Sequence, residues 1–393
     1  MTEQSRWPTE RAGRSTVLAQ FGQARADLMQ WALTTGDVLA DAVVAEMHEI
    51  GMKQARPVLD KGVREGLASL VDPPPALEAL LRQTESVPGY VDDFLLDQGP
   101  TPFYTSPLPV HVIALNTGSL IRVYGSPSIS TVLTTTGRLV DSAQRRIQET
   151  GAWLTRVMLP GGLRVGQPGY VATLEVRMLH AHMRRLALDR GYDSSAHGCP
   201  INQVDLGRTW MDFTLTAYTA EGLLGFGLSN RELADLYRYW WHIAHLLGID
   251  ARLVEGIAGN EAAARLDAVF QTVTGPVTED SAVLADATLA SVTSALNQML
   301  KAPRGLARPA LNAIARRIHG DGMCQDLRIP PAPVADAWLG PVLSGLALAR
   351  DRRRRDPGRW QAAIDRNLAA ARDLLARPDH PTAYQRGATG SDD

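Results

Sequence analysis

The stretch LEVRMLHAHMRRLAL, residues 174–188, has the pattern of a buried amphipathic helix. At about 100° per residue, its apolar side chains gather on one face at helical spacing. These side chains are Val176, Leu179, Met183, Leu186 and Ala187. His180 lies on the shoulder of that face, whereas His182 points about 160° away from His180. The two imidazoles therefore cannot bind one ion, and the candidate for an inward-facing ligand is His180.

The composition around this stretch is that of a large globular protein. The chain has 393 residues, of which 45% are hydrophobic and 21% are charged, so it can bury a large core. Its formal net charge of −2 argues against nucleic-acid binding, because nucleic-acid-binding domains carry a basic excess. The basic run RDRRRRD at 350–356 contains aspartates and predicts a solvated helix face, with an anionic-lipid or partner patch as the alternative.

The cysteine content and the hydropathy pattern bear on the compartment. The two cysteines, Cys199 and Cys324, exclude a disulfide framework and suit a reducing environment. The first residues lack the apolar run of a secretory signal, and no apolar stretch approaches the ~20 residues that span a bilayer. We therefore expect a soluble cytoplasmic protein without a transmembrane segment. The sequence does not specify an oligomeric state.

The chain as a whole favours an all-α fold, because alanine, leucine and arginine dominate and runs of β-branched residues are few. Helices are predicted at 15–34, 36–52, 56–70, 75–84, 129–158, 171–190, 204–223, 230–248, 259–273, 280–299, 306–318 and 359–376. The segment 107–125 leaves strand and helix open. We predict a single helical domain over 35–376 with its core at 129–248, an N-terminal helical extension over 1–34, and a disordered tail over 377–393.

The helix predicted at 129–158 carries two polar residues in its apolar stripe. Arg146 and Thr150 stand at i and i+4, where apolar residues are expected. The rest of the stripe consists of Leu139, Ala143, Trp153, Leu154 and Val157. A buried guanidinium needs partners or a polar cavity to offset its desolvation. Either Arg146 pairs with an acid on a neighbouring helix, or Arg146 and Thr150 line a cavity that binds an anionic or polarised group.

His180 also leaves two interpretations open, a hydrogen-bonded core histidine or a metal ligand. Arg177 and Arg184 lie three residues before it and four residues after it, on nearly the same side of the helix. Their positive charge disfavours protonation of His180, which suits a neutral imidazole bonded to iron. If the ligand is haem, the two arginines can also pair with its propionates.

Other metal and catalytic motifs are absent from the sequence. His242 and His245 are close on one predicted helix, but no carboxylate motif accompanies them. There is no His-Glu-x-x-His, Cys-x-x-Cys, Gly-x-Ser-x-Gly, Walker loop or dinucleotide fingerprint. In GCPINQVDLGRTWMDFTL at 198–215, Asn202 is a predicted helix cap.

A polar stripe follows that cap. Asp205, Thr209 and Asp212 stand at i, i+4 and i+7, which predicts a buried hydrogen-bond network between helices. Arg146 and Arg184 are the candidate partners of these acids. A direct catalytic role of the stripe is the less favoured interpretation.

Taken in order, RRIQETGAW, MLPGGLRVGQPGYVATLEVRMLHAHMRR, GCPINQVDLGRTWMDFT and LYRYWWHIAHLLG resemble the haem-dependent oxygenase family of latex-clearing proteins and the fungal MpaB-type oxygenase. The resemblance covers roughly 35–330 and is strongest at 137–250. It implies a globin-like helical core around one haem b, with additional surrounding helices. It implies His180 as the proximal iron ligand with Arg184 one turn later, and Arg146 with Thr150 on the distal helix.

The resemblance also implies a chemistry. Latex-clearing members cleave carbon–carbon double bonds of polyisoprene with O₂, and the MpaB type cleaves a prenyl side chain. Rubber-degrading members have a lysine just before the distal threonine, where this chain has Glu149. The family acid proposed as the base has no counterpart between Tyr124 and Asp141. Either Glu149 takes that role or the chemistry differs.

We therefore expect a haem b-dependent oxygenase that uses O₂ to oxidise a lipophilic alkene- or isoprenoid-type small molecule, including cleavage of a double bond. The predicted site comprises the iron ligand His180, the further cofactor contacts Arg184 and Arg177, and the catalytic residues Arg146, Thr150 and Glu149. Two alternatives stay open. One is a haem peroxidase or peroxygenase that uses H₂O₂, and the other is a non-catalytic haem- or lipid-binding helical protein.

Overall fold

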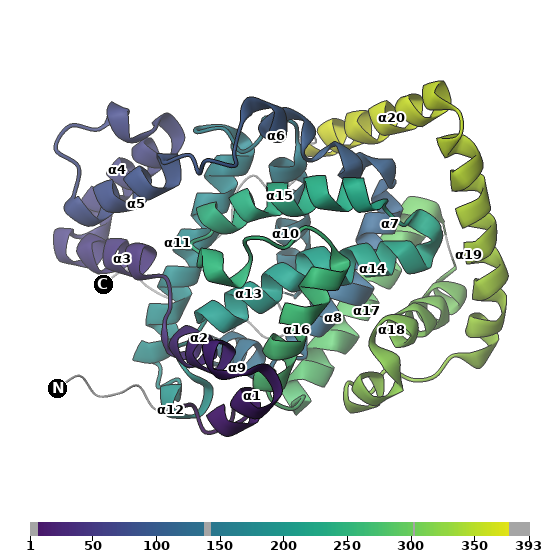
Figure 1. The fold of residues 1–393 in the computed structure, drawn as a ribbon, viewed down its shortest axis with the longest axis horizontal. Helices are drawn as coiled ribbons and strands as arrows, with labels where there is room; N and C mark the ends of the chain where they lie inside the picture. Colours follow the sequence, from purple (N-terminus) through teal and green to yellow (C-terminus); the bar gives the residue numbers. More distant parts are fainter. Residues whose placement is uncertain (1–6, 137–142, 302, 377–393) are drawn as a thin grey trace.

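The computed structural model describes residues 7–136, 143–301 and 303–376, and every regular element in these ranges is a helix (Figure 1). The predicted all-α fold is confirmed. The first helices are α1 (Arg14–Phe21), α2 (Gln23–Thr34), α3 (Val38–Ile50), α4 (Met52–Glu65), η1 (Leu67–Ser69), α5 (Pro75–Glu85), α6 (Asp93–Gln98) and η2 (Thr101–Thr105).

The central part of the chain holds the helices that later form the candidate site. They are α7 (Leu108–Ile113), η3 (Ala114–Leu120), α8 (Ile121–Tyr124), α9 (Pro127–Thr135), α10 (Ala143–Met158), α11 (Pro168–Asp189), α12 (Ser194–His197), α13 (Gln203–Met211), η4 (Asp212–Thr216), α14 (Ala217–Glu221), η5 (Gly222–Phe226) and α15 (Asn230–Leu246). The last helices are η6 (Ala251–Leu253), α16 (Asn260–Thr274), α17 (Glu279–Leu300), α18 (Arg304–Asp326), α19 (Pro333–Arg354) and α20 (Pro357–Leu375).

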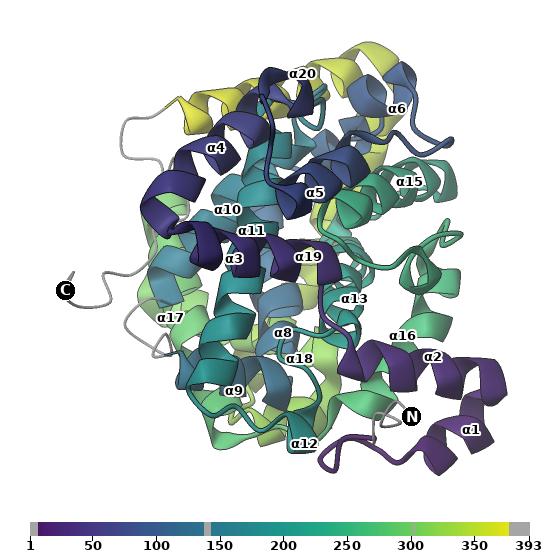
Figure 2. The ribbon, with the colours of Figure 1, turned by 90° about the vertical axis from the view of Figure 1, so that its left-hand side faces the viewer.

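Helices α10, α11, α13 and α15 lie in the middle of the molecule, and the others surround them (Figure 1). Helix α11 packs against α10, α3 and α15, and α10 also contacts α17 and α20. Figure 2 shows α3 crossing α11 on one side. The largest hydrophobic core includes Trp210, Tyr237 and Trp240, which are almost completely buried. The centre of the fold is thus a layer of helices that is itself covered on several sides.

Local sequence signals explain several helix ends. The side chain of Asp37 caps α3 by accepting a hydrogen bond from the backbone N–H of Ala40. Asn202 caps α13 through the N–H of Asp205 at 3.0 Å, which confirms the predicted cap. Ser229 and Glu232 form a capping box at the start of α15.

The N-terminal helices are part of the main core. Val17, Met29 and Leu33 are fully buried in it. Arg11 forms an ion pair of 3.0 Å with Asp205, and both side chains are buried. The core therefore continues across the boundary predicted between residues 34 and 35. The predicted tail over 377–393 lies outside the described residues.

Two predicted helices need correction, and one open assignment is resolved. The single helix predicted over 129–158 is wrong, because α9 ends at Thr135 and α10 begins at Ala143; Leu139 of its stripe lies outside the described residues. The helix predicted over 15–34 is divided at Gly22, whose φ of 83° is incompatible with a right-handed helix. The ambiguous segment 107–125 is helical rather than extended.

The sequence pattern also does not predict α19, although this helix has 22 residues. The helix lies at the edge of the molecule (Figure 1), and its buried residues are Ala335, Leu339 and Arg350. A helix with so little buried surface has no continuous apolar stripe. Two prolines, at its first position and in its interior, weaken the helical signal further.

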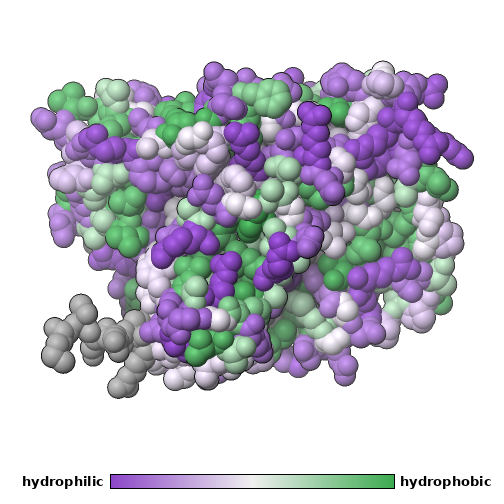
Figure 3. Space-filling view, viewed as in Figure 1, coloured by the Kyte–Doolittle hydropathy of each residue, from purple (hydrophilic) through white to green (hydrophobic). Residues whose placement is uncertain are grey.

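The surface carries a mixture of side chains. On the face shown in Figure 3, hydrophobic side chains gather in small groups between hydrophilic ones. Among the described residues, no helix combines the length and the apolar composition that crossing a bilayer requires.

Buried histidines make the stability of the fold sensitive to acid. Burial, with a smaller contribution from the neighbouring His245, lowers the pKa of His242 to about 4 from an ordinary value of 6.5. As the pH falls below 6.5, the unfolded chain binds this proton first, so folding stability is lost between pH 6.5 and pH 4. From pH 7 to pH 5, this one group accounts for up to about 2 kcal/mol.

We predict that His242→Leu makes the free energy of unfolding less dependent on pH between 7 and 5. Urea denaturation at the two pH values measures this dependence, and the exposed His48, replaced by leucine, is the control. An unchanged pH dependence in His242→Leu would contradict the assignment of a neutral buried imidazole.

Candidate active site

Two consecutive helices, α10 and α11, approach each other closely enough for backbone contact. A Cβ atom at Gly169 of α11 would lie 2.6 Å from the carbonyl oxygen of Gly162 and 2.7 Å from that of Arg156. It would also lie 2.9 Å from Cα of Val157. The N–H of Tyr170 donates to the carbonyl of Gly162 at 2.8 Å, which closes the glycine-rich connection between the helices. A residue without a side chain is therefore required at position 169.

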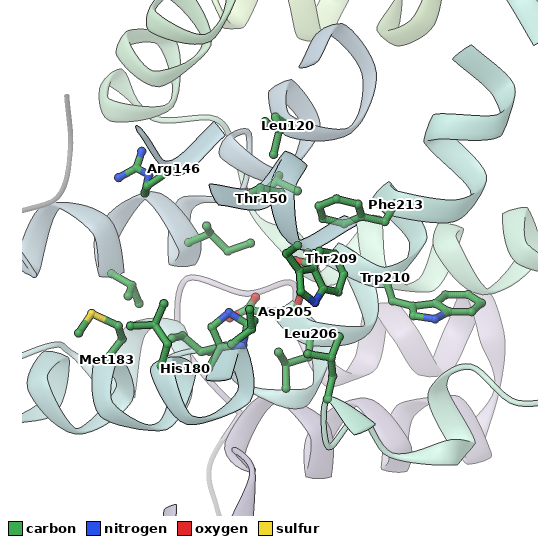
Figure 4. A pocket seen from close by; sticks show the side chains of 18 of the residues that line it. Leu120, Arg146, Thr150, His180, Met183, Asp205, Leu206, Thr209, Trp210 and Phe213 are labelled. Carbon is green, nitrogen blue, oxygen red and sulfur yellow. The ribbon is translucent and has the colours of Figure 1, made fainter. Parts of the chain in front are cut away.

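A cavity of about 260 Å³ lies between the two helices, with further walls from α8, α9 and α13 (Figure 4). Most of its lining is apolar. The apolar lining residues are Leu120, Val123, Ile129, Val132, Leu133, Trp153, Val176, Leu179, Met183, Ile201, Leu206, Trp210, Phe213, Trp240, Leu247 and Ile249. Its charged and polar lining residues are Tyr124, Thr136, Arg146, Glu149, Thr150, His180, Asp205 and Thr209. The cavity is a lipophilic space with few polar groups, as is typical of small-molecule sites.

His180 faces this cavity from α11 (Figure 4). Protein surrounds the ring on its other sides, and Nδ1 is buried without a hydrogen-bond partner among the described residues. Burial, followed by the charge of Arg184, lowers the pKa of His180 to about 4. The imidazole is therefore neutral near pH 7 and offers a lone pair. Of the two arginines expected to disfavour protonation, Arg184 contributes to this shift, after burial.

The three residues predicted on the opposite side, Arg146, Glu149 and Thr150, all line the cavity from α10. In Figure 4, Thr150 lies across the cavity from His180, and Arg146 lies nearer to Met183 with its guanidinium directed away from His180. The guanidinium of Arg146 is 5.8 Å from the centre of the Tyr124 ring.

Glu149 is buried, and its Oε1 accepts a hydrogen bond of 2.8 Å from Nε of Arg145. The side chain of Thr150 has no hydrogen bond among the described residues, so its hydroxyl is available to a ligand. The structure thus brings an imidazole, a hydroxyl, a carboxylate and a guanidinium to one apolar space.

Arg177 and Arg184 do not line the cavity. Nε and Nη2 of Arg177 donate to the two oxygens of Asp37 at 2.6 and 3.0 Å, and its Nη1 donates to Oε1 of Gln83. Nε of Arg184 donates to Asp41 at 2.8 Å, and its Nη1 donates to a backbone carbonyl. The two arginines therefore tie α11 to α3, and neither has the cavity contact that pairing with a propionate would need.

The predicted polar network of α13 exists, but its partners differ from those expected. Asp205 is bonded through Oδ1 to Arg11 and to Ser128, not to Arg146 or Arg184. Asp212 pairs with Arg122 at 3.1 Å. These arginines are distant in sequence from α13, and no local pattern relates them to it.

Sequence periodicity also missed the exposure of Asp205 to the cavity, because the pattern predicts a buried network there. Its Oδ2 is buried without a partner among the described residues. The aromatic walls Trp210 and Phe213 were missed as well. Their apolar character in a helix is equally typical of an ordinary core.

The donor set constrains which metal group this site can hold. Among the described residues, no three His, Cys, Asp or Glu side chains come together as metal ligands. A lone neutral imidazole facing an apolar cavity fits a metal whose other ligands come from a prosthetic group, as in haem. The residues present are thus compatible with a haem that His180 would hold.

Comparisons with known proteins show the family and the fold of the chain. The family model described as "ER-bound oxygenase mpaB/B'/Rubber oxygenase, catalytic domain" matches residues 110–350, a range that includes α10 and α11. The chain is similar to a solved structure of latex clearing protein in the closed state, with a TM-score of 0.66 and 19% identity. The match covers 86% of this chain and 91% of that chain. At this identity, the likeness concerns the fold. No curated protein sequence matches the chain.

We predict that Gly169→Ala destabilises the protein by about 1–3 kcal/mol, because the new methyl group meets backbone atoms that have no room to move. Gly151→Ala in α10 is the control, since a Cβ atom there has no neighbour within 4 Å and alanine favours a helix. Urea denaturation of both variants measures the difference. Equal stability of Gly169→Ala and wild type would contradict the close contact between α10 and α11.

Proposed function

Because the chain belongs to the family of the ER-bound oxygenase mpaB/B' and rubber oxygenase catalytic domain, we propose that it is a haem b-dependent oxygenase. Its proposed substrates are O₂ and a lipophilic small molecule with an alkene or isoprenoid group. The observation that carries this proposal is the neutral, unpaired His180 imidazole, which faces an apolar cavity between α10 and α11.

His180 would hold the haem iron, and bound haem would supply the activation of O₂. The pairs Arg177–Asp37 and Arg184–Asp41 would act on this ligand indirectly, by fixing the helix that carries it. The charge of Arg184 also keeps the imidazole neutral, as a metal ligand must be.

Residues of α10 would act from the other side of the cavity. The free hydroxyl of Thr150 can donate a hydrogen bond to an oxygen atom in the cavity, and Arg146 provides a permanent positive charge at its edge. The carboxylate of Glu149, which accepts a hydrogen bond from Arg145, would accept a proton from a bound molecule. The apolar walls select a lipophilic substrate and exclude water from it.

We predict that His180→Ala abolishes the Soret absorption band of the purified protein, because the proposed iron ligand is lost. His182→Ala is the matched control on the same helix, since His182 does not line the cavity, and this variant should keep the band. An absorption spectrum of each protein, expressed with haem supplied, provides the measurement. A Soret band that persists in His180→Ala and disappears in His182→Ala would overturn the ligand assignment.

We predict that Thr150→Val lowers kcat by about 10²-fold and leaves the Soret band unchanged, because only the hydrogen-bond donor is removed. Thr209→Val is the control, since Thr209 lines the same cavity but its hydroxyl already donates to the carbonyl of Asp205 at 2.7 Å. Oxygen uptake with a linear isoprenoid alkene and a reductant measures turnover.

A similar loss in both threonine variants would argue against a specific role of Thr150. The same assay tests the oxidant. Turnover with H₂O₂ under argon, without turnover under O₂, would show that the protein is a peroxygenase and not an oxygenase.

A further inference from the structure

A second cavity, of about 390 Å³, lies on another face of α10. It is lined by Ile147, Gly151 and Leu154 of that helix, whereas the first cavity is lined by Arg146, Glu149 and Trp153. The remaining walls come largely from α7, α17 and α20. Both cavities share the lining residues Leu120, Thr150 and Phe213, which therefore form the wall between them.

A buried polar group stands in the wall of the second cavity. Nδ1 of His111 is 2.7 Å from Oε1 of Glu221, and Oγ of Ser106 donates to Oε2 of Glu221 at 3.1 Å. The ring of Phe103 stacks on the imidazole with centroids 3.8 Å apart and planes 5° apart. The side chains of His111 and Glu221 are only 6% and 5% exposed. The imidazole is therefore held in one position by Glu221 and Phe103, and Ser106 in turn holds the carboxylate of Glu221.

This arrangement selects the tautomer of a neutral His111 ring. A carboxylate only accepts hydrogen bonds, so in the neutral ring the proton resides on Nδ1 and Nε2 is an acceptor. Nε2 is buried and has no partner among the described residues. An unsatisfied buried acceptor destabilises a fold, which a ligand with an O–H group would relieve.

The rest of the cavity defines the body of such a ligand. Its walls include Leu108, Val112 and Leu115 near His111, and Val292 and Leu374 from the later helices. Its volume lies within the ~300–1,000 Å³ that small-molecule sites occupy. Polar side chains line it as well, and Oδ1 of Asn116 is a second buried acceptor without a partner among the described residues. A molecule with a hydroxyl at one end and a hydrocarbon chain beyond it can place the hydroxyl at His111 and the chain against the apolar walls.

We propose that the second cavity binds a lipophilic alcohol, whose hydroxyl donates a hydrogen bond to Nε2 of His111 and whose hydrocarbon chain lies along α10. Glu221, Ser106 and Phe103 act as positioning residues for that imidazole. The identification of this alcohol as the substrate rests on the proposed function; its binding does not. The shared wall at Thr150 places the bound molecule next to the candidate active site.

Isothermal titration calorimetry of the full-length, haem-loaded protein tests the proposal with two isomers, 1-decanol and methyl nonyl ether. The isomers have the same size, but only the alcohol can donate a hydrogen bond. We expect wild type to bind 1-decanol about tenfold more tightly than the ether. His111→Phe should bind both isomers with the affinity that wild type has for the ether.

Two further variants keep this test decisive. Replacing His111 by Phe leaves a buried carboxylate unpaired, so the double variant His111→Phe with Glu221→Leu removes both polar partners together. Ala295→Phe in α17 fills the second cavity and should weaken the binding of both isomers at least tenfold. The binding of decanol to the first cavity would instead leave the Ala295→Phe affinities unchanged and would overturn the proposal.

Equal affinity of wild type for the two isomers, or a preference for 1-decanol that survives in both His111 variants, would also overturn it. Because binding is measured without turnover, either result leaves the haem assignment untouched. Conversely, a wild-type protein without a Soret band would contradict the proposed function. The preference for 1-decanol over the ether would still show whether the second cavity binds an alcohol through His111.

Discussion

The contact between α10 and α11 at Gly169 is the constraint on which the candidate site depends. Backbone atoms meet backbone atoms there, so the two helices are fixed at one end of their packed length. Beyond this point, larger side chains keep the helices apart, and Trp153 donates to Thr173 across the interface at 3.2 Å. The space that remains further along is the first cavity, with His180 on one wall and Thr150 on the other. A shift of either helix would move both groups relative to each other.

The charges around α11 are arranged to support that geometry. Two arginines on this helix, Arg177 and Arg184, are paired with Asp37 and Asp41 at the start of α3 and so hold α11 against that helix. A buried pair costs desolvation, and its main benefit here is a defined position. Arg184 has a second effect, since its charge disfavours the protonation of His180. Burial is the main cause of the lowered pKa of His180, and Arg184 adds to it, so this arginine contributes both to the position and to the protonation state of the imidazole.

Helical periodicity was sufficient to predict the all-α fold, the inward orientation of His180 and the unusual position of Arg146 and Thr150 on one face. It could not predict partners, because the pairing of Asp205 with Arg11 joins residues 194 positions apart. It missed α19, which buries too few residues to have an apolar stripe. The contact of His111 with Glu221 could not be predicted either, because the two residues are 110 positions apart in the sequence. The local sequence pattern indicates which face of a helix is buried, whereas the tertiary fold determines which residues that face contacts.

Helix α10 separates two cavities of different chemistry, and this division follows from its own sequence. Residues 146, 149, 150 and 153 face the site that contains His180, and the intervening residues 147, 151 and 154 face the space that contains His111. Thr150 belongs to both linings, so its side chain is part of the wall between the cavities. A larger residue at position 150 would narrow both cavities, whereas larger residues at 147 or 151 would narrow only the cavity that contains His111. The spacing of α10 therefore lets the linings of the two cavities be altered separately, except at Thr150.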